Sequence, residues 1–330
     1  MPVVVFLRIR APNRLRKPQT RPMLEVANIV LPVFALIALG YAFRRTGIMS
    51  AAAITELNRF VVYLALPALT IDIMISSSME VLWQPGFIIA FEIAVAVLFI
   101  PVLLFHWIKS KNLARATIDA TAASYANTGY IGIPLCLLAF GKESLPPAVI
   151  AGILTVSFNF AFSIILMEIS SKKGASIGAA LKDLGVSLIK NPLIVSPVIG
   201  GIMLASGIHF PRGITEGVRL LGSAACPCAL VATGLFLAQK QETTSALVSI
   251  ELVLLKLIVQ PLIAWFFAYH VLSMPGIWAK TAVILSAMPT GTGPFMLAEM
   301  YGKGAGIASR TILLSTIGSV ITLFIWLAVL

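Results

Sequence analysis

The chain has 330 residues, of which 59% are hydrophobic and only 11% are charged. Soluble domains carry about 25% charged residues, so this composition is typical of a membrane protein. The formal net charge is +11, but six of the 24 Lys and Arg precede Met23. The basic balance therefore reflects membrane topology and does not indicate a nucleic-acid partner.

Residues 1–22 form a basic segment with four prolines, and their one apolar stretch, 3–7, is too short for the core of a signal peptide. We interpret this segment as a disordered tail or as an artefact of an early start codon. The first membrane span is expected to begin immediately after Met23.

Apolar runs of about 20 residues then alternate with short polar connections, which predicts an all-α polytopic membrane protein with ten transmembrane helices. The predicted spans are 24–43, 55–75, 86–107, 116–138, 146–169, 191–208, 217–238, 246–271, 280–299 and 306–329. The connections leave no room for a soluble catalytic domain, and no Gly-rich phosphate loop occurs, so we expect neither an enzyme nor a cofactor.

An internal repeat relates the two halves of the chain. One constant shift along the sequence superposes Pro32 on Pro192, Pro67 on Pro227, Pro101 on Pro261 and Pro134 on Pro294. Each half holds five predicted spans, and an odd number means that the second half enters the membrane from the opposite side. We therefore predict inverted repeats at 23–169 and 191–330, joined by a cytoplasmic connector at 170–190.

Positive charges predict the orientation. After the tail, 13 Lys and Arg lie in or beside the connections that follow the odd-numbered spans, and 4 lie in or beside the even-numbered ones. By the positive-inside rule the odd-numbered connections are cytoplasmic and both termini face outward. Within the connector, apolar residues at helical spacing from Ile177 to Leu188 fit either a short helix on the membrane surface or a simple basic linker.

Two predicted spans are interrupted by Gly and Pro, at 127–134 and at 288–294. Such breaks expose backbone groups that lipid cannot satisfy, so they survive only beside protein or a wet cavity. Pro134 and Pro294 suit the start of a second half-helix, whose free N–H groups would point at the middle of the membrane.

Two broken helices at matching places predict one central ligand site. The alternative is that the polar side chains there only satisfy the broken backbone. The residues expected to contact a substrate are Asn127, Thr128, Gly129, Thr290, Gly291 and Thr292, and those shaping the crossover are Gly132, Pro134, Pro289, Gly293 and Pro294.

Ionisable residues inside the membrane are further candidates because burying a charge is costly. Glu92, Glu251 and Lys256 lie deepest and could carry a coupling ion or a counter-charge. For Lys256, the alternative is an ion pair with an acid from another helix. The default for acids nearer span ends, such as Asp119, and for the histidines is an interfacial position. The three cysteines are interpreted as buried small apolar residues, and no metal site is expected.

The sequence resembles the auxin efflux carrier family, whose bacterial members include proteins assigned as malate and malonate permeases. The resemblance rests on Asn58-Arg59-Phe60-Val61 with Leu66-Pro67, on Asn127-Thr128 through Pro134, on Lys190-Asn191-Pro192, and on Pro289 through Phe295. It implies a ten-helix fold in which spans 1, 2, 6 and 7 form a dimerising scaffold and the other six form a mobile transport domain.

The same resemblance implies that Asn127 contacts the substrate. The connector at 170–190 is much shorter than the loop of plant members, which argues against auxin as the substrate. We therefore expect a secondary transporter of small organic anions, mono- or dicarboxylates such as malate or malonate, in a bacterial inner membrane, coupled to H⁺ or Na⁺ and assembled as a homodimer. The alternatives are a passive channel or uniporter and a non-transporting membrane sensor.

Overall fold

The computed structural model describes residues 22–171, 185, 189–207, 210–239 and 246–330, and within them every regular element is a helix. Seven of these helices are long and apolar enough to cross a membrane, and three shorter apolar helices cover Thr128–Phe140, Pro192–Ser206 and Gly276–Ser286. The all-helical membrane architecture expected from the sequence is thus present. The ten-span inverted repeat stays a prediction, and most of the connector and residues 1–21 lie outside the described part of the chain.

The first half of the chain forms the following helices. They are α1 (Met23–Arg45), α2 (Ala51–Phe60), η1 (Val61–Ala65), α3 (Leu66–Ile75), α4 (Met79–Leu82), α5 (Pro85–Ser110), α6 (Leu113–Ser124), η2 (Thr128–Gly132), α7 (Ile133–Phe140), η3 (Lys142–Ser144), α8 (Leu145–Leu154), η4 (Thr155–Phe160) and α9 (Ala161–Ser171).

The second half continues with another series of helices. They are α11 (Pro192–Ser206), α12 (Arg212–Ser223), α13 (Ala225–Leu237), α14 (Ala246–Leu254), η5 (Leu255–Val259), α15 (Gln260–Phe266), η6 (Phe267–Val271), α16 (Gly276–Ser286), α17 (Gly293–Tyr301) and α18 (Ala305–Val329).

Prolines explain several widened turns in these helices. The π-helical segments η1, η2 and η5 each end just before a proline, at Pro67, Pro134 and Pro261 respectively. Proline lacks an N–H and crowds the carbonyl one turn earlier, and a π turn lets the helix pass this point without breaking. Pro134 is the second residue of α7, as its expected place at a helix start requires, but η2 and α7 are continuous from Thr128 to Phe140, so the half-helix itself begins at Thr128.

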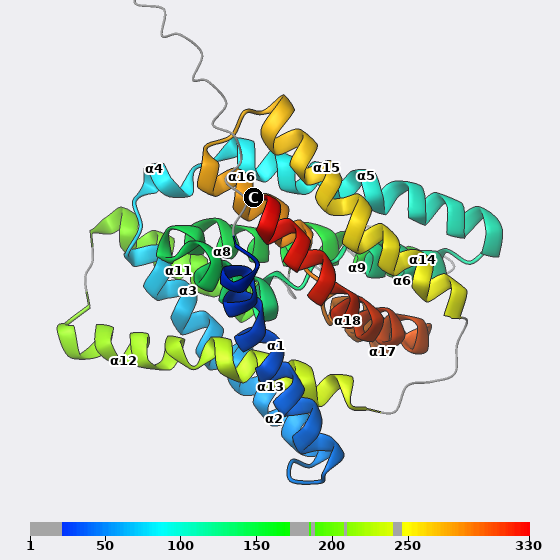
Figure 1. Cartoon of the computed structure of the whole chain (residues 1–330), viewed down its shortest axis with the longest axis horizontal. Helices are drawn as coiled ribbons and strands as arrows, with labels where there is room; N and C mark the ends of the chain where they lie inside the picture. The colour runs from blue at the N-terminus through cyan, green and yellow to red at the C-terminus, as the bar shows by residue number, and fades with distance from the viewer. Residues whose placement is uncertain (1–21, 172–184, 186–188, 208–209, 240–245) are drawn as a thin grey trace, which may run out of the picture.

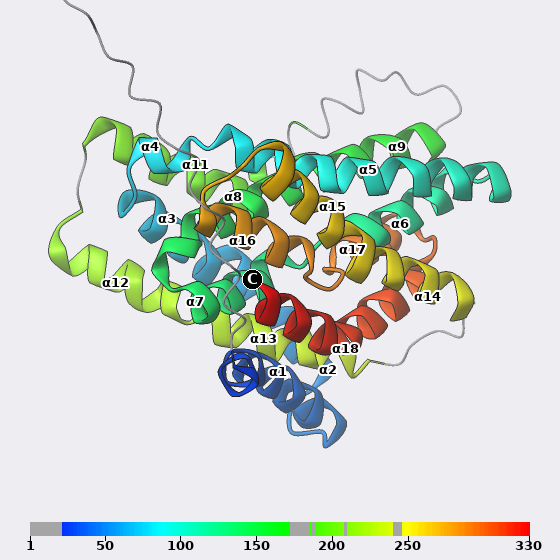
Figure 2. The ribbon, with the colours of Figure 1, turned by 45° about the horizontal axis from the view of Figure 1, so that its top comes forward.

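The helices gather into two groups (Figures 1 and 2). In one group α1 packs along α13, and α3 packs against α11 and α12. In the other, α5 packs along α6, α9 and α17 pack against α6, α14 against α18, and α15 against α16. The segment η2 packs against α7 and α8, which contact α16 of this second group, whereas α2 packs against α13 of the first. The first group is tight because Gly234 of α13 faces α1, where a Cβ atom would collide with the carbonyl oxygen of Ile37.

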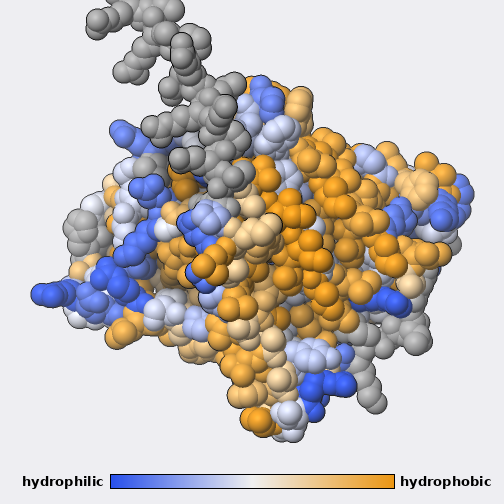
Figure 3. All heavy atoms as spheres, in the orientation of Figure 1, coloured by the Kyte–Doolittle hydropathy of each residue, from blue (hydrophilic) through white to orange (hydrophobic). Residues whose placement is uncertain are grey.

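The outer surface is strongly apolar, as a lipid environment requires. Hydrophobic residues cover most of the face shown in Figure 3, and polar residues gather mainly toward its edges. Leu31, Ile202 and Ile321 are among the large hydrophobic side chains that lie exposed. Burying these side chains in lipid instead of water is favourable by about 1.5–3 kcal/mol each.

Candidate functional site

The two predicted breaks lie against each other. The first separates α6, which ends at Ser124, from η2; the second separates α16, which ends at Ser286, from α17. Asn127 N donates a hydrogen bond to Pro289 O at 2.9 Å, and Gly291 N donates to Tyr125 O at 2.9 Å. Each interrupted segment therefore provides hydrogen-bond partners for backbone N–H and C=O groups of the other, which lipid could not provide.

Side chains of one neighbouring helix cap the carboxyl ends of both first half-helices. Gln260 Nε2 donates to Ser124 O at 3.1 Å, and Lys256 Nζ donates to Ser286 O at 2.7 Å. Both side chains are fully buried. Carbonyls at the end of a helix carry partial negative charge, so the N–H donors of an amide and of a lysine amine are well suited to cap them.

The ion pair considered for Lys256 is absent from the described residues, where its Nζ makes no contact with a carboxylate. The sequence suggested an acidic partner because a buried charge needs compensation. In its place Lys256 Nζ donates a short hydrogen bond to the carbonyl end of α16, where the helix dipole favours a donor.

A cavity of about 180 Å³ lies where the amino ends of η2 and α17 meet. An enclosed space of about 150 Å³ accommodates a solute the size of benzene in another protein, so this cavity suits a molecule of a few heavy atoms. The lining residues include Tyr125–Tyr130, Gly291–Gly293, Gly152 and Phe160 from one helix group, and Val62, Leu66, Thr70, Asn191 and Leu193 from the other.

The electrostatic character of the cavity comes from backbone groups. No Asp, Glu, Lys, Arg or His is among the described residues that line it. The N–H groups of the first helical turn have no partner within their own helix, and the amino end of a helix carries partial positive charge. Two such ends, at Thr128 and Gly293, lie beside one small cavity. At the first end Thr128 N already donates to Ala126 O and Tyr130 N to Asn127 Oδ1, so this end would act on an anion mainly through its positive potential.

Asn127 is placed to serve both roles considered for the polar residues at the breaks, a contact to the substrate and a hydrogen bond to the interrupted backbone. Its Oδ1 accepts a hydrogen bond from Tyr130 N at 3.2 Å and so caps η2. Its Nδ2 makes no hydrogen bond within the described residues, although the side chain lies at the cavity and the residue is only 7% exposed. Asn127 thus stabilises the broken backbone with one atom and offers two N–H donors to a ligand with the other.

Two tyrosines complete the site and were not singled out from the sequence. The Tyr125 ring lies across the second break, where a Cβ atom on Gly293 would come within 2.6 Å of its Cζ. Tyr130 donates from its hydroxyl to Asn58 Oδ1 on α2 at 3.3 Å and so links the two helix groups. The interruption at Tyr125-Ala126-Asn127 pointed to the region, but no spacing rule distinguishes a ring over the cavity from one facing lipid.

Most residues expected to contact a substrate line this cavity. Asn127, Thr128, Gly129, Gly291 and Thr292 do so. Thr290 does not: it is fully buried, and its Oγ1 donates to Ala122 O of α6 at 2.8 Å.

The expected crossover residues have structural roles. Pro289 O accepts the bond from Asn127 N, and Pro294 lies in the first turn of α17 as expected. Gly132 allows close contact with α16, because a Cβ atom there would come within 2.7 Å of Leu285 Cδ2.

The remaining ionisable candidates lie away from the cavity. Glu92 is partly buried on α5, and Glu251 on α14 lies 3.7 Å from the imidazole of His106. His106 and Asp119 are buried, at 8% and 2% exposure, so Asp119 lacks the interfacial exposure expected for it, while the membrane depth of His106 stays a prediction. Cys136 is buried as expected, whereas Cys226 and Cys228 are only partly so.

Comparison with known proteins gives consistent relatives. The model of the membrane transport protein family matches residues 26–327. A protein of Rhizobium meliloti named "Putative malonate transporter" is 31% identical over 91% of this chain and 94% of its own length. Uncharacterized transporters of Methanocaldococcus jannaschii and Escherichia coli (YfdV) are 25% and 22% identical over 91% of this chain, and over 97% and 96% of their own lengths.

The matched region contains both broken helices and the cavity between them. The chain therefore belongs to the membrane transport protein family, which is the auxin efflux carrier family that the sequence resembles.

Proposed function

We propose that this protein is a secondary transporter of small organic anions, mono- or dicarboxylates such as malonate or malate. The observation that carries the proposal is the cavity of about 180 Å³ at two helix amino ends, with the free Nδ2 of Asn127 beside it. A carboxylate is a strong acceptor for backbone and amide N–H groups, and the helix ends supply positive potential without a basic side chain. The relative named for malonate supports a substrate of this class.

We propose that transport proceeds by alternating access. The cavity lies between the two helix groups, because Val62, Leu66 and Asn191 of the first group close one side of it. Movement of the group that contains the broken helices would carry this cavity, with its ligand, along the other group. The hydrogen bond from Tyr130 to Asn58 would then break and re-form in each cycle.

The proposal includes the membrane location, the orientation and the oligomeric state of the protein. The apolar outer surface supports a multi-pass position in a bilayer, and the distribution of Lys and Arg supports termini that face outward from a bacterial inner membrane. We further propose a homodimer through the group that contains α1, α3, α11, α12 and α13, because the resemblance to the family implies a dimerising scaffold made of spans 1, 2, 6 and 7.

Uptake of radiolabelled carboxylates into proteoliposomes tests the proposal. Purified protein should take up malonate or a related carboxylate with saturation, and vesicles preloaded with unlabelled substrate should show counterflow of the label. A passive channel would give uptake without saturation or counterflow, and a sensor would bind the ligand without uptake. Either result, with a panel of mono- and dicarboxylates, would contradict secondary transport.

A further inference from the structure

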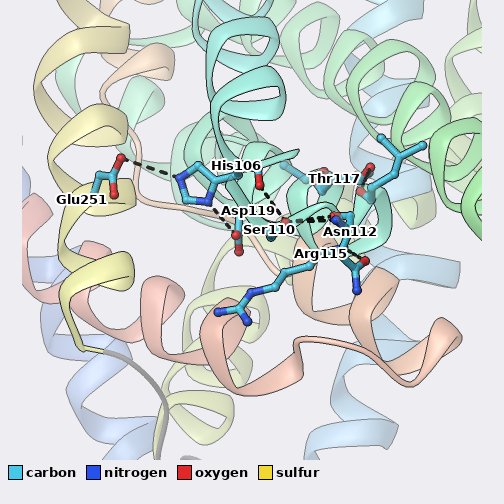
Figure 4. A network of polar contacts seen from close by, with 9 residues as sticks. His106, Ser110, Asn112, Arg115, Thr117, Asp119 and Glu251 are labelled. Atoms are coloured by element: carbon cyan, nitrogen blue, oxygen red, sulfur yellow. Dashed lines mark hydrogen bonds and ion pairs between the residues drawn. The ribbon is translucent and has the colours of Figure 1, made fainter. Parts of the chain in front are cut away.

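A buried imidazole joins three helices at a place distinct from the cavity (Figure 4). His106 Nδ1 on α5 lies 2.8 Å from Asp119 Oδ2 on α6, and His106 Nε2 lies 3.7 Å from Glu251 Oε1 on α14. Asp119 is 2% exposed, whereas 43% of the Glu251 side chain is exposed. The three side chains therefore form a line from the interior to the outer surface of the helix group.

The local sequence brings this cluster together. α5 and α6 form a tight hairpin in which Lys111 adopts a left-handed conformation with φ of 54° and Asn112 Oδ1 caps α6 by accepting from Arg115 N. Ser110 Oγ also donates to the carbonyl of His106 at 2.7 Å. Because the connection is so short, His106 near the end of one helix faces Asp119 in the next.

The cluster contains buried acceptor atoms that lack a hydrogen-bond partner and could bind a proton. His106 Nε2 and Asp119 Oδ1 are buried and have no hydrogen-bond partner among the described residues. Lys109 and Arg115 of the hairpin form no ion pair with Asp119 or Glu251 in the residues that the structure describes. Protonation of the imidazole places one cation between two carboxylates, which lowers the net charge held in a poorly solvated site.

The ligand atoms of the cluster, one imidazole and two carboxylates, suit a proton better than a metal cation. Na⁺ and other hard cations require several oxygen ligands, and imidazole is a poor ligand for them. No group of three or more His, Cys, Asp or Glu in the described residues has the geometry to hold a metal ion. Histidine is the side chain whose protonation ordinarily changes near neutral pH, so it is suited to bind and release a proton in each cycle.

Two of the three helices that carry the cluster also hold the crossover. On α6, Ser124 lies five residues after Asp119, and its carbonyl accepts the bond from Gln260. Glu251 lies on the continuous helix α14–η5–α15 that also presents Gln260. A change in the attraction between α6 and α14 at one end is thus transmitted to the bond that joins them at the cavity.

We propose that His106, Asp119 and Glu251 bind the proton that is coupled to movement of the organic anion, an inference that rests on the proposed transport function. Half-exposed Glu251 exchanges the proton with the outside of the helix group, and the buried pair of His106 and Asp119 holds it. The anion in the cavity and the proton in this cluster occupy separate sites on one moving group of helices.

Proteoliposomes that contain the pH dye pyranine separate the two proposals. Counterflow of labelled malonate, or of another carboxylate from the panel, measures substrate transport alone, and the dye measures proton flux that accompanies net substrate flux. The wild-type protein should move protons together with the anion. Glu251→Gln, Asp119→Asn and His106→Gln should lower the ratio of proton flux to substrate flux at least tenfold.

His270→Gln is the matched control, because His270 is exposed and its ring lies against the rings of Trp265 and Phe266, with centroids 4.5 and 5.7 Å away. Its flux ratio should equal that of the wild type. Because the side chain of Glu251 is half exposed, Glu251→Gln tests the proposal even where a buried substitution prevents folding.

Wild-type counterflow without proton flux, or an unchanged flux ratio in Glu251→Gln, would overturn the proton site and leave the transport function standing. Absence of wild-type counterflow for the whole panel would instead contradict the transport function itself.

Discussion

Substitution of Asn127 separates a ligand contact from a structural cap, because the two roles use different atoms of one side chain. Oδ1 caps η2 by accepting from Tyr130 N at 3.2 Å, while Nδ2 lies free at the cavity. Asn127→Asp keeps an oxygen for the cap and removes both donors. A hydrogen bond to a charged acceptor contributes about 1.5–3 kcal/mol, so losing it should raise the Kd for a carboxylate roughly 10- to 150-fold. Repulsion between the new carboxylate and the anion adds to this loss.

Asn127→Ala removes the cap as well as the donors. Loss of a helix cap costs about 1 kcal/mol, so this variant should also melt a few degrees lower in detergent, whereas Asn127→Asp should keep its cap. Substrate affinity from counterflow and melting temperature from a thermal scan distinguish the variants. Wild-type affinity in Asn127→Asp, with a lower melting temperature in Asn127→Ala, would refute a ligand contact and leave only the structural role.

Individual contacts and the charge distribution give three more expected outcomes. Thr292→Val removes a hydroxyl at the cavity and should weaken substrate affinity about three- to tenfold. Thr290→Val removes the bond to α6 and should lower stability by about 1–3 kcal/mol with little change in affinity. The reverse pattern in binding and melting assays would refute the assignment of the two residues. Gly293→Ala should reduce both uptake and melting temperature, because its Cβ would meet a tyrosine ring at 2.6 Å, and a fully active variant would show that the ring moves freely. In a chain whose three native cysteines are replaced by alanine, Met79→Cys should react with an impermeant thiol reagent in intact cells and Lys173→Cys should not; reversed labelling would refute the orientation.

Much of the architecture is predictable from the sequence because lipid imposes simple rules. Apolar length predicts the spans, and Gly with Pro inside a span predicts a break that must be satisfied by protein. Both breaks are present and contact each other. The outcome for Thr290 was not predictable, because its neighbours Gly291 and Thr292 line the cavity while its own hydroxyl turns to Ala122. Such a difference depends on backbone angles within the break, which no periodic pattern specifies.

The cluster of His106, Asp119 and Glu251 could not be recognised from the sequence, because the proximity of its side chains becomes evident only in the structure. His106 and Asp119 lie on successive helices, and each lies near one end of its predicted span, so each looked interfacial when considered alone. The short link between their helices was the available signal, since antiparallel neighbours place residues near the shared turn opposite each other. For Lys256, no sequence signal distinguishes a carboxylate partner from the carbonyl end of α16 that it actually binds.

The central claim is that an organic anion binds in the crossover cavity, and protection of an introduced cysteine tests it directly. Met296 and Met300 lie one turn apart on α17 and are 53% and 64% exposed, but only Met296 is among the cavity-lining residues. In a chain without native cysteines, Met296→Cys and Met300→Cys are alkylated with N-ethylmaleimide in detergent, with and without the carboxylate that shows counterflow. We predict that the carboxylate slows modification of Met296→Cys at least tenfold and leaves the rate for Met300→Cys unchanged. Equal rates with and without the carboxylate at both positions would contradict a substrate site at the crossover.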